Sequence, residues 1–96
     1  MAQKIRWSPR AADNLENIVN YIAQDSEHYA SLFAQRIMRI IENIPQFPLS
    51  GRVVPEYRDD FLREKIYKNY RIVYRIKKEV IEIVAICHSA MPLKDL

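Results

Sequence analysis

The chain has 96 residues, of which 49% are hydrophobic and one is glycine, a composition that predicts a single folded domain over residues 1–96 rather than a disordered chain. The net charge of +3 is mild, the lone cysteine excludes an internal disulfide bond, and no short Cys/His pattern predicts a metal or cofactor site. No apolar run reaches membrane-spanning length and the N-terminus lacks the apolar segment of a signal peptide, so we expect a soluble cytoplasmic protein without a membrane partner.

Near the N-terminus, the sequence predicts a short strand followed by a helix. Charged and apolar residues alternate in Lys4–Trp7, as in a strand that joins the edge of a sheet. Ser8 is a favourable N-cap, and Pro9 at the first helical position loses only an N–H that would have no partner. The apolar stripe of this helix consists of Ala11, Ala12, Leu15, Ile18, Val19, Tyr21 and Ile22.

A second helix follows after a short break, which predicts an antiparallel helix hairpin. Asp25 or Ser26 can cap it, and Pro45 ends it because proline cannot continue the hydrogen-bond ladder. Its apolar stripe consists of Ala30, Phe33, Ile37, Ile40, Ile41 and Ile44. Residues 45–60 are rich in proline and contain the only glycine, so they form a long shaped loop with a brief extended piece at residues 52–54.

The next predicted strand covers Leu62–Tyr67. We expect Ile66 to pair with Tyr70 of the strand that follows. This register places Leu62 and Ile66 on a covered face and Arg63 and Lys65 on an open face. Glu64 then points inward, and the sequence leaves open whether it lies at an edge or pairs with a helix residue.

The last two predicted strands form a hairpin. Tyr70–Ile76 alternates with a period of two, and residues 80–87 are apolar except for Glu82. Pairing of Lys77 with Val80 gives the covered face Tyr70, Ile72, Tyr74, Ile76, Ile81, Ile83, Ala85 and Cys87, and the open face Arg71, Arg75, Glu82 and His88. Arg75 then lies opposite Glu82.

These elements predict an α+β fold: an N-terminal strand, an antiparallel helix hairpin, then a three-stranded antiparallel sheet with the helices packed on one face. The charge is concentrated near the expected open face. Residues 52–78 hold nine of the fifteen Lys and Arg but four of the twelve Asp and Glu, a local balance of +5. This asymmetry favours an anionic partner, either nucleic acid or an acidic protein segment, and a scattered solvated surface is the alternative.

Several motifs occur in one order over almost the whole chain. They are W-S-P-R-A-A at residues 7–12, S-G-R-V-V-P-E at 50–56, L-R-E at 62–64, Y-R-I-V-Y-R-I at 70–76 and C-H-S-A at 87–90. In this order the chain resembles the RelE/ParE superfamily of bacterial type II toxins. The resemblance implies the RelE/ParE-like toxin fold, growth inhibition, plasmid stabilisation and a cognate antitoxin that wraps the toxin in a hetero-oligomer.

Two activities occur in the superfamily that the chain resembles. ParE-like members bind and inhibit DNA gyrase, whereas RelE-like members cut mRNA on the ribosome. The G-R-V-V-P-E stretch and the arginine-rich strand resemble the ParE side. Members commonly carry an arginine three residues after the last-strand histidine, where this chain has Met91. That departure favours gyrase inhibition over mRNA cleavage; an inactive relative that only binds antitoxin is a third interpretation.

Metal-independent RNA cleavage needs a base or acid and a cation that stabilises the charge on the phosphate. The candidates are His88 as acid or base and Arg71, Arg63 or Lys65 as cations, should the protein be a nuclease. A histidine that closes a strand can instead bond only to backbone.

Without catalysis, the expected binding residues are Arg52, Glu56, Arg63, Arg71 and Arg75. Arg75 could equally be tied to Glu82, and Glu56 could act as a general base or fix its loop by a hydrogen bond. Tyr57 and Tyr67 could stack on bases, although packing is the commoner role of tyrosine in a sheet.

Overall fold

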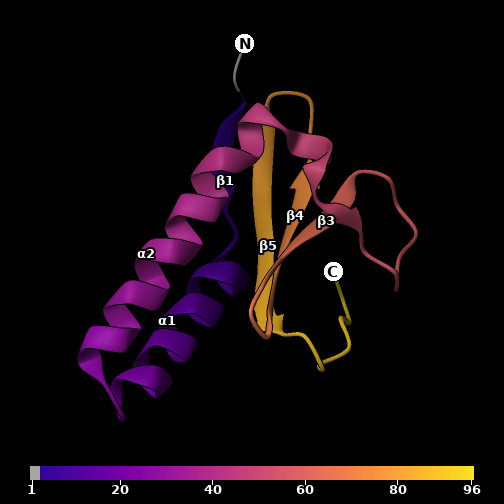
Figure 1. The fold of residues 1–96 in the computed structure, drawn as a ribbon. Helices are drawn as coiled ribbons and strands as arrows, with labels where there is room; N and C mark the ends of the chain where they lie inside the picture. The colour runs from indigo at the N-terminus through magenta and orange to yellow at the C-terminus, as the bar shows by residue number, and fades with distance from the viewer. Residues whose placement is uncertain (1–2) are drawn as a thin grey trace.

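In the computed structural model, which describes residues 3–96, five strands form one sheet and two helices cover one of its faces (Figure 1). Along the chain the elements are β1 (Lys4–Trp7), α1 (Pro9–Ala23), α2 (Glu27–Asn43), β2 (Arg52–Val53), β3 (Leu62–Tyr67), β4 (Tyr70–Ile76) and β5 (Val80–His88), with short 3-10 helices at Ile44–Gln46 and Pro48–Ser50. The strand order is β1-β5-β4-β3-β2, with β1 parallel to β5 and the other neighbours antiparallel. The α+β prediction is confirmed, and the sheet has five strands because β1 and β2 extend its two edges.

Both helices begin at the serines that the sequence predicts. Ser8 Oγ accepts a 3.0 Å hydrogen bond from the Ala11 N–H, and Ser26 Oγ accepts one from the Tyr29 N–H at the same distance. These bonds satisfy N–H groups that have no partner within the helix. α2 gives way to a 3-10 turn just before Pro45.

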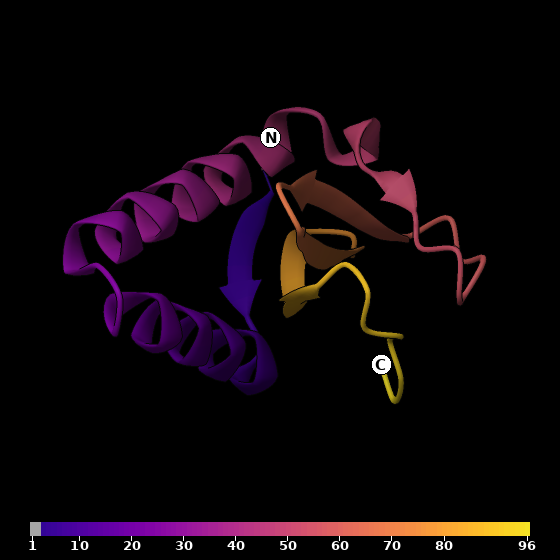
Figure 2. The same cartoon turned by 60° about the horizontal axis from the view of Figure 1, so that its bottom comes forward.

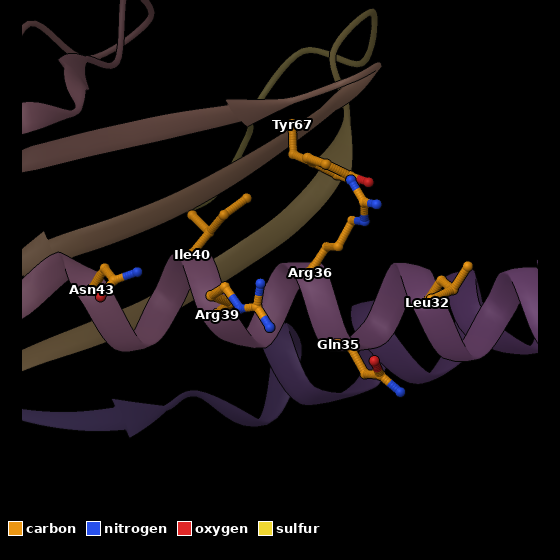
Figure 3. A pocket seen from close by; sticks show the side chains of 7 residues that line it. All are labelled: Leu32, Gln35, Arg36, Arg39, Ile40, Asn43 and Tyr67. Carbon is orange, nitrogen blue, oxygen red and sulfur yellow. The ribbon is translucent and has the colours of Figure 1, made fainter.

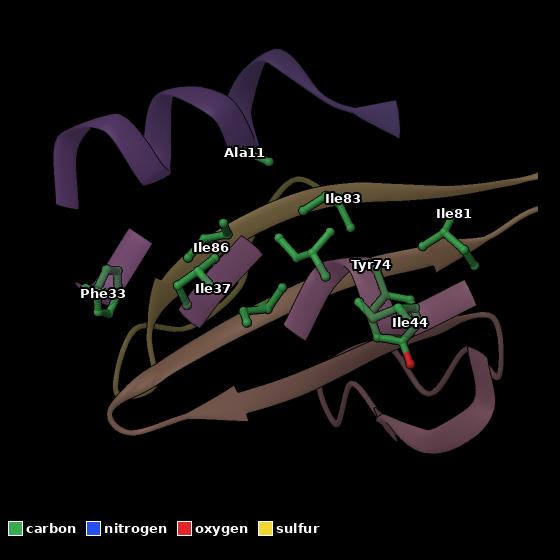
Figure 4. Packing of buried hydrophobic residues seen from close by; sticks show 10 residues of the cluster. Ala11, Phe33, Ile37, Ile44, Tyr74, Ile81, Ile83 and Ile86 are labelled. Atoms are coloured by element: carbon green, nitrogen blue, oxygen red, sulfur yellow. The ribbon is translucent and has the colours of Figure 1, made fainter. Parts of the chain in front are cut away.

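The core lies between the helix hairpin and the sheet (Figure 4). Its largest members on the sheet are Tyr74 and the isoleucines of β4 and β5, and Phe33, Ile37 and Ile41 approach them from α2. The Tyr74 hydroxyl donates to the Pro48 carbonyl at 2.6 Å and accepts from the Gly51 N–H at 3.1 Å. The loop after α2 is thereby bonded to the sheet at a buried point.

The pairing of β4 with β5 contains a β-bulge that the sequence pattern does not predict. The expected register holds for the half of the hairpin near its turn, but Val73 pairs with Ala85 instead of Val84. Because one extra residue breaks the two-residue period, the side chains beyond it change faces. Ile86 therefore packs in the core under the helices, whereas Ala85 and Cys87 belong to a cluster on the other face, so their predicted faces are wrong.

The same bulge separates His88 from the arginines. Arg71 pairs with Cys87 and Tyr70 pairs with His88, so the His88 side chain leaves the sheet on the helix side. Its ring lies edge-on to that of Tyr70, with the centroids 5.8 Å apart. The prediction that His88 shares a face with Arg71 and Arg75 is therefore wrong.

Side chains of α1 and its cap satisfy backbone groups of β5 beyond the end of β1. Ser8 Oγ donates to the Val84 carbonyl at 3.2 Å, next to the bulge. Asn14 Oδ1 accepts a 3.0 Å hydrogen bond from the Ile86 N–H. β1 is too short to pair with Val84 and Ile86, so side chains at the start of α1 provide the hydrogen bonds that a longer strand would make there.

β3 pairs with β4 one residue out of the expected register. Tyr67, not Ile66, lies opposite Tyr70, across a two-residue turn in which Lys68 has a left-handed φ of 52°. A two-residue turn determines the register of its hairpin, and a slip of one residue exchanges the faces. Arg63 and Lys65 therefore lie on the helix side, and Leu62, Glu64 and Ile66 lie on the other side.

The face of the sheet away from the helices is covered, not open. A second apolar cluster consists of Val54, Leu62, Val73, Val84, Ala85 and Leu93, with Cys87 and Leu96 packed against it. Residues 91–96, the C-terminal strap, return across this face on the side opposite the helices (Figure 2). The expected open basic surface is therefore replaced by a second, smaller core.

Candidate functional site

Arg71 is the centre of a buried ionic network under the C-terminal strap. Its side chain projects from β4 on the face away from the helices and the residue is only 4% exposed. The Nη1 and Nη2 groups donate to the two carboxylate oxygens of Glu56, each at 2.8 Å. The Nε group donates to Glu64 Oε1 at 2.6 Å. Two carboxylates thus enclose one guanidinium in the planar fork geometry that arginine favours.

Glu64 owes its partners to the register of β3. Because Glu64 lies opposite Val73, its side chain projects on the same face as Arg71. Its other oxygen accepts a hydrogen bond from Nε of Arg52, on the neighbouring strand β2. The inward-pointing glutamate that the sequence leaves without an assigned partner is therefore held by two arginines.

The network shifts the proton affinity of its members. Hydrogen bonds from Arg71 lower the pKa of Glu56 to about 2, and the Leu93 N–H, which donates to Glu56 Oε2 at 3.2 Å, acts in the same direction. The hydrogen bonds to Glu56 raise the pKa of Arg71 above its usual value. Arg71 is therefore charged, and all three of its nitrogens already donate to Glu56, Glu64 or the Met91 carbonyl, which leaves little capacity for an incoming phosphate.

The C-terminal strap is bonded to the rest of the molecule on both sides. The Tyr57 hydroxyl donates to the Leu93 carbonyl at 3.2 Å and accepts from the Leu96 N–H at 3.3 Å. From α1, Arg10 Nη1 donates to the carbonyls of Lys94 and Asp95, at 3.1 and 3.3 Å. Glu56 thus fixes the strap through Leu93, the loop-fixing role that the sequence offers as one of two interpretations.

Cys87 lies beneath this strap, in the second cluster. The thiol is half-buried, and its burial raises the pKa of Cys87. A protonated, half-buried thiol is a poor nucleophile, so Cys87 is a packing residue in the closed strap.

His88 is exposed at the end of β5. Its Nδ1 accepts a 3.1 Å hydrogen bond from the Ala90 N–H, and Nε2 has no hydrogen-bond partner within residues 3–96. The residue borders a hollow of about 300 Å³ between α1 and the strap, together with Asn17 and Arg10. His88 therefore has a free ring nitrogen, but the sheet lies between it and Arg71.

The two remaining catalytic candidates have different environments. Arg63 donates to three backbone carbonyls, at 2.8 Å to Asp60, 3.2 Å to Leu49 and 3.0 Å to Gly51, and so joins both ends of the loop. Lys65 has no ion-pair partner within residues 3–96 and borders a hollow beside α2. The four residues expected for cleavage are thus distributed over two faces of the sheet.

Arg75 and Arg52 remain partly accessible on the side of the strap. Arg75 lies opposite Glu82, as predicted, but its ion pair is with Asp59 at 3.7 Å. Glu82 instead pairs with Arg6 at 3.3 Å and Lys77 at 3.4 Å. Of the two alternatives for Arg75, the tie to Glu82 is not formed, because the loop before β3 brings the Asp59 carboxylate to Arg75.

The sequence reasoning overlooked two cations on α2, Arg36 and Arg39. They border a hollow between α2 and β3 and have no ion-pair partner in the described part of the chain. Their spacing of three residues on an amphipathic helix is the signal that could have identified them. Within residues 3–96, no group of three His, Cys, Asp or Glu side chains is placed to hold a metal ion, and neither helix is long and apolar enough to cross a membrane.

Comparison with known proteins identifies the family. The family described as the ParE toxin of the type II toxin-antitoxin system, parDE, matches residues 5–93. The chain belongs to this toxin family. A candidate toxin of Sinorhizobium fredii, Y4kP, is 33% identical to this ParE-family chain over 89 residues, which cover 91% of the chain and 88% of the relative.

Solved structures share the fold of this ParE-family chain at lower identity. The chromosomal ParDE system of P. aeruginosa contains a chain with a TM-score of 0.74 and 20% identity, covering 91% of this chain and 96% of that one. The RelBE2 toxin-antitoxin complex of Mycobacterium tuberculosis gives a TM-score of 0.64 at 15% identity, covering 92% and 99%. The YoeB/ParE toxin of Agrobacterium tumefaciens gives 0.64 at 18%, covering 90% and 98%. The RelE/ParE-like toxin fold is therefore confirmed.

Proposed function

We propose that this ParE-family toxin arrests growth by binding DNA gyrase and inhibiting it, without itself catalysing a reaction. The arrangement around Arg71 carries the proposal. A nuclease would need Arg71 to stabilise charge on a phosphate, but each of its three nitrogens already donates to Glu56 or Glu64, and two carboxylates balance its charge. His88, the candidate acid or base, lies on the opposite face of the sheet, and Met91 stands where members of the superfamily that the chain resembles commonly carry an arginine.

The accessible residues of the predicted set are suited to binding. Arg52 keeps 61% of its side-chain surface exposed while one nitrogen bonds Glu64, and Arg75 is 30% exposed. Both guanidinium groups therefore retain donors for carboxylates of a protein partner. We assign them to the contact with gyrase, with Glu56, Arg63 and Arg71 as the groups that hold this surface in shape.

A cognate antitoxin is the second partner that we propose. The similar chains from P. aeruginosa and M. tuberculosis belong to a ParDE system and to a RelBE2 toxin-antitoxin complex. By this similarity the protein forms a toxin-antitoxin hetero-oligomer in the cytoplasm, where gyrase acts, and the antitoxin neutralises it.

One observation favours an alternative, ribosome-dependent mRNA cleavage. His88 Nε2 is free and lies beside a hollow that could receive a ribose. In that case His88 would act as acid or base, and Arg63 and Lys65, on its side of the sheet, would approach the RNA; Arg71 would only support the strap.

The deciding experiment is a gyrase supercoiling and DNA-cleavage assay with antitoxin-free protein, titrated through stoichiometric amounts. We expect lost supercoiling or trapped cleaved DNA with wild type and equally with His88→Ala, because His88 has no role in the binding mechanism. No effect of folded, antitoxin-competent protein on gyrase, together with His88-dependent cleavage of mRNA on translating ribosomes, would replace this proposal by the alternative.

A further inference from the structure

Four cations gather between α2 and β3, on the helix side of the sheet. Arg36 and Arg39 project from α2 and Lys65 from β3, and they line two adjoining hollows of about 490 and 360 Å³. Figure 3 shows Arg36 extending from α2 toward the ring of Tyr67 on β3. Lys68 follows β3 directly, and its Nζ lies 5.7 Å from the centroid of the same ring. Arg36, Arg39, Lys65 and Lys68 are here called the α2–β3 cations.

In the described part of the chain, no carboxylate balances the α2–β3 cations. None of the four has an ion-pair partner there, and no acidic residue lines either hollow. Lys68 Nζ donates to the Tyr29 hydroxyl at 2.6 Å, which raises the pKa of Lys68, whereas the positive charge of Arg36 lowers it. Cations of this surface therefore repel one another, and a polyanion would relieve that repulsion.

Two of the α2–β3 cations stand on each side of the hollows. On the helix side, Arg36 and Arg39 are about 4.5 Å apart along the axis of α2, because they are three residues apart in sequence. The side-chain amide of Asn43 borders both hollows. Arginine, lysine and amide groups are side chains that donate to phosphate oxygens in complexes with nucleic acids. A sugar-phosphate chain that lies between helix and strand would therefore meet donors on both sides.

The aromatic rings beside these cations are already in contact with other side chains. Lys68 Nζ lies 5.1 Å from the ring centroid of Tyr29 and 5.7 Å from that of Tyr67, and Tyr67 packs against Phe33 with the ring centroids 5.8 Å apart. Phe47, which lines the second hollow, is 70% exposed, but it is a single ring. Single-stranded nucleic acid is held by successive bases stacked on aromatic rings. Cations without such a series of rings are better suited to the phosphates of a duplex.

The α2–β3 cations lie on the opposite face of the sheet from the residues assigned to gyrase. Arg52 lies opposite Glu64 and Arg75 lies opposite Leu62, so both project on the strap side. Lys65 alternates with Glu64 along β3 and therefore projects toward the helices. A toxin that contacts gyrase with the strap side thus keeps the helix side free for the DNA that gyrase holds.

We infer that the α2–β3 cations bind the phosphate backbone of the duplex DNA held by gyrase, so that the toxin contacts enzyme and DNA together. This inference rests on the proposed inhibition of gyrase and adds the DNA substrate of that enzyme as a further partner. The contact does not depend on base sequence, because phosphates are the groups that the cations recognise. An acidic protein segment is the competing occupant. Every nucleotide of a duplex carries a negative charge, which suits four uncompensated cations better than scattered carboxylates do.

Neutralisation of the two arginines on α2 tests the inference. In Arg36→Gln/Arg39→Gln both residues are exposed, and glutamine has a helix propensity close to that of arginine. The matched control, Lys4→Gln/Lys78→Gln, removes the same charge at exposed residues outside the two hollows. Each protein, labelled with a fluorophore and free of antitoxin, is titrated with gyrase alone and with gyrase bound to a linear DNA duplex.

Wild type and the control should bind the gyrase–DNA complex more tightly than gyrase alone. Loss of two phosphate contacts changes the slope of log affinity against log salt by about 1.8, so over the decade from about 1 M to about 0.1 M salt the arginine variant should become about 60-fold weaker than wild type in binding the complex. All three proteins should bind gyrase without DNA equally, which also shows that the variant is folded.

The unfavourable outcomes distinguish this inference from the proposed function. No gain from DNA in wild type, or an equal gain in Arg36→Gln/Arg39→Gln, would overturn the inference and leave the inhibition of gyrase intact. Weaker binding of that variant to gyrase without DNA would assign the cations to an acidic surface of the enzyme instead. Failure of wild type to bind gyrase in either form would remove the proposed function and the inference with it.

Discussion

Arg71 is held between the carboxylates of Glu56 and Glu64 and is itself buried, so its removal should destabilise the fold. In Arg71→Met the carboxylate of Glu64, whose side chain has no exposed surface, loses its buried partner. Removal of one partner from a buried ion pair costs about 3–5 kcal/mol of the free energy of unfolding. Because Arg52 still bonds Glu64, we expect the lower end of this range, which urea titration would measure. The control Arg75→Met removes a partly exposed pair at 3.7 Å and should cost less than about 1 kcal/mol. Similar losses in the two variants would contradict the described burial of the network.

Glu56 makes the stability of the protein depend on acid pH. Its pKa falls from 4.5 to about 2 in the folded state because Arg71 stabilises the carboxylate. A lowered folded-state pKa contributes stability that is fully present above about pH 4.5 and is lost as the pH falls toward 2. Thermal unfolding of Glu56→Gln should therefore show its largest deficit against wild type above pH 4.5, and a smaller deficit near pH 2.5. An equal loss of stability at all pH values would show that Glu56 stabilises the fold through its packing and not through its charge.

At the scale of the elements, the C-terminal strap closes the second face through few bonds, and Cys87 reports whether it is closed. Tyr57→Phe removes the hydroxyl that bonds both Leu93 and Leu96. Loss of these bonds weakens strap closure by about 1–2 kcal/mol, so labelling of the Cys87 thiol by a disulfide reagent should accelerate about tenfold. The control is Tyr21→Phe, at a residue that is 73% exposed, and in this variant the Cys87 thiol should be labelled at the wild-type rate. Equal rates in the two variants would mean that strap opening does not limit access to the thiol.

Across the whole molecule, positively charged side chains have different partners on the two faces of the sheet. Beneath the strap, arginines pair with carboxylates of the same chain, and an apolar cluster surrounds them. Between α2 and β3, by contrast, Arg36, Arg39 and Lys65 have no ion-pair partner among the described residues. The net charge of +3 is therefore unevenly distributed. Positive charges are paired with carboxylates on the strap side of the sheet and are unpaired on the helix side.

Local signals in the sequence predicted the elements well, because their causes lie within a few residues. Ser8 and Ser26 cap the helices through bonds to N–H groups three residues on. The helical stripe from Phe33 to Ile44 is buried as its spacing requires. The residues that could carry chemistry were also visible as residue types, since His88 is one of two histidines and Arg71 and Arg75 interrupt an otherwise apolar strand.

By itself, the sequence determined the α+β class, the two helices, the buried face of α2 and the strands that pair; on α1 the predicted stripe is too wide, because Tyr21 is 73% exposed. Only the tertiary structure decided the faces of the residues in β3 and at the end of β5. The bulge at Val84 and the two-residue turn at Lys68 each displace the pattern by one residue, and a strand with apolar residues on both faces does not oppose such a shift. These two shifts bring Glu64 to Arg71 and remove His88 from it, so the candidate site depends on contacts between strands that no local pattern encodes.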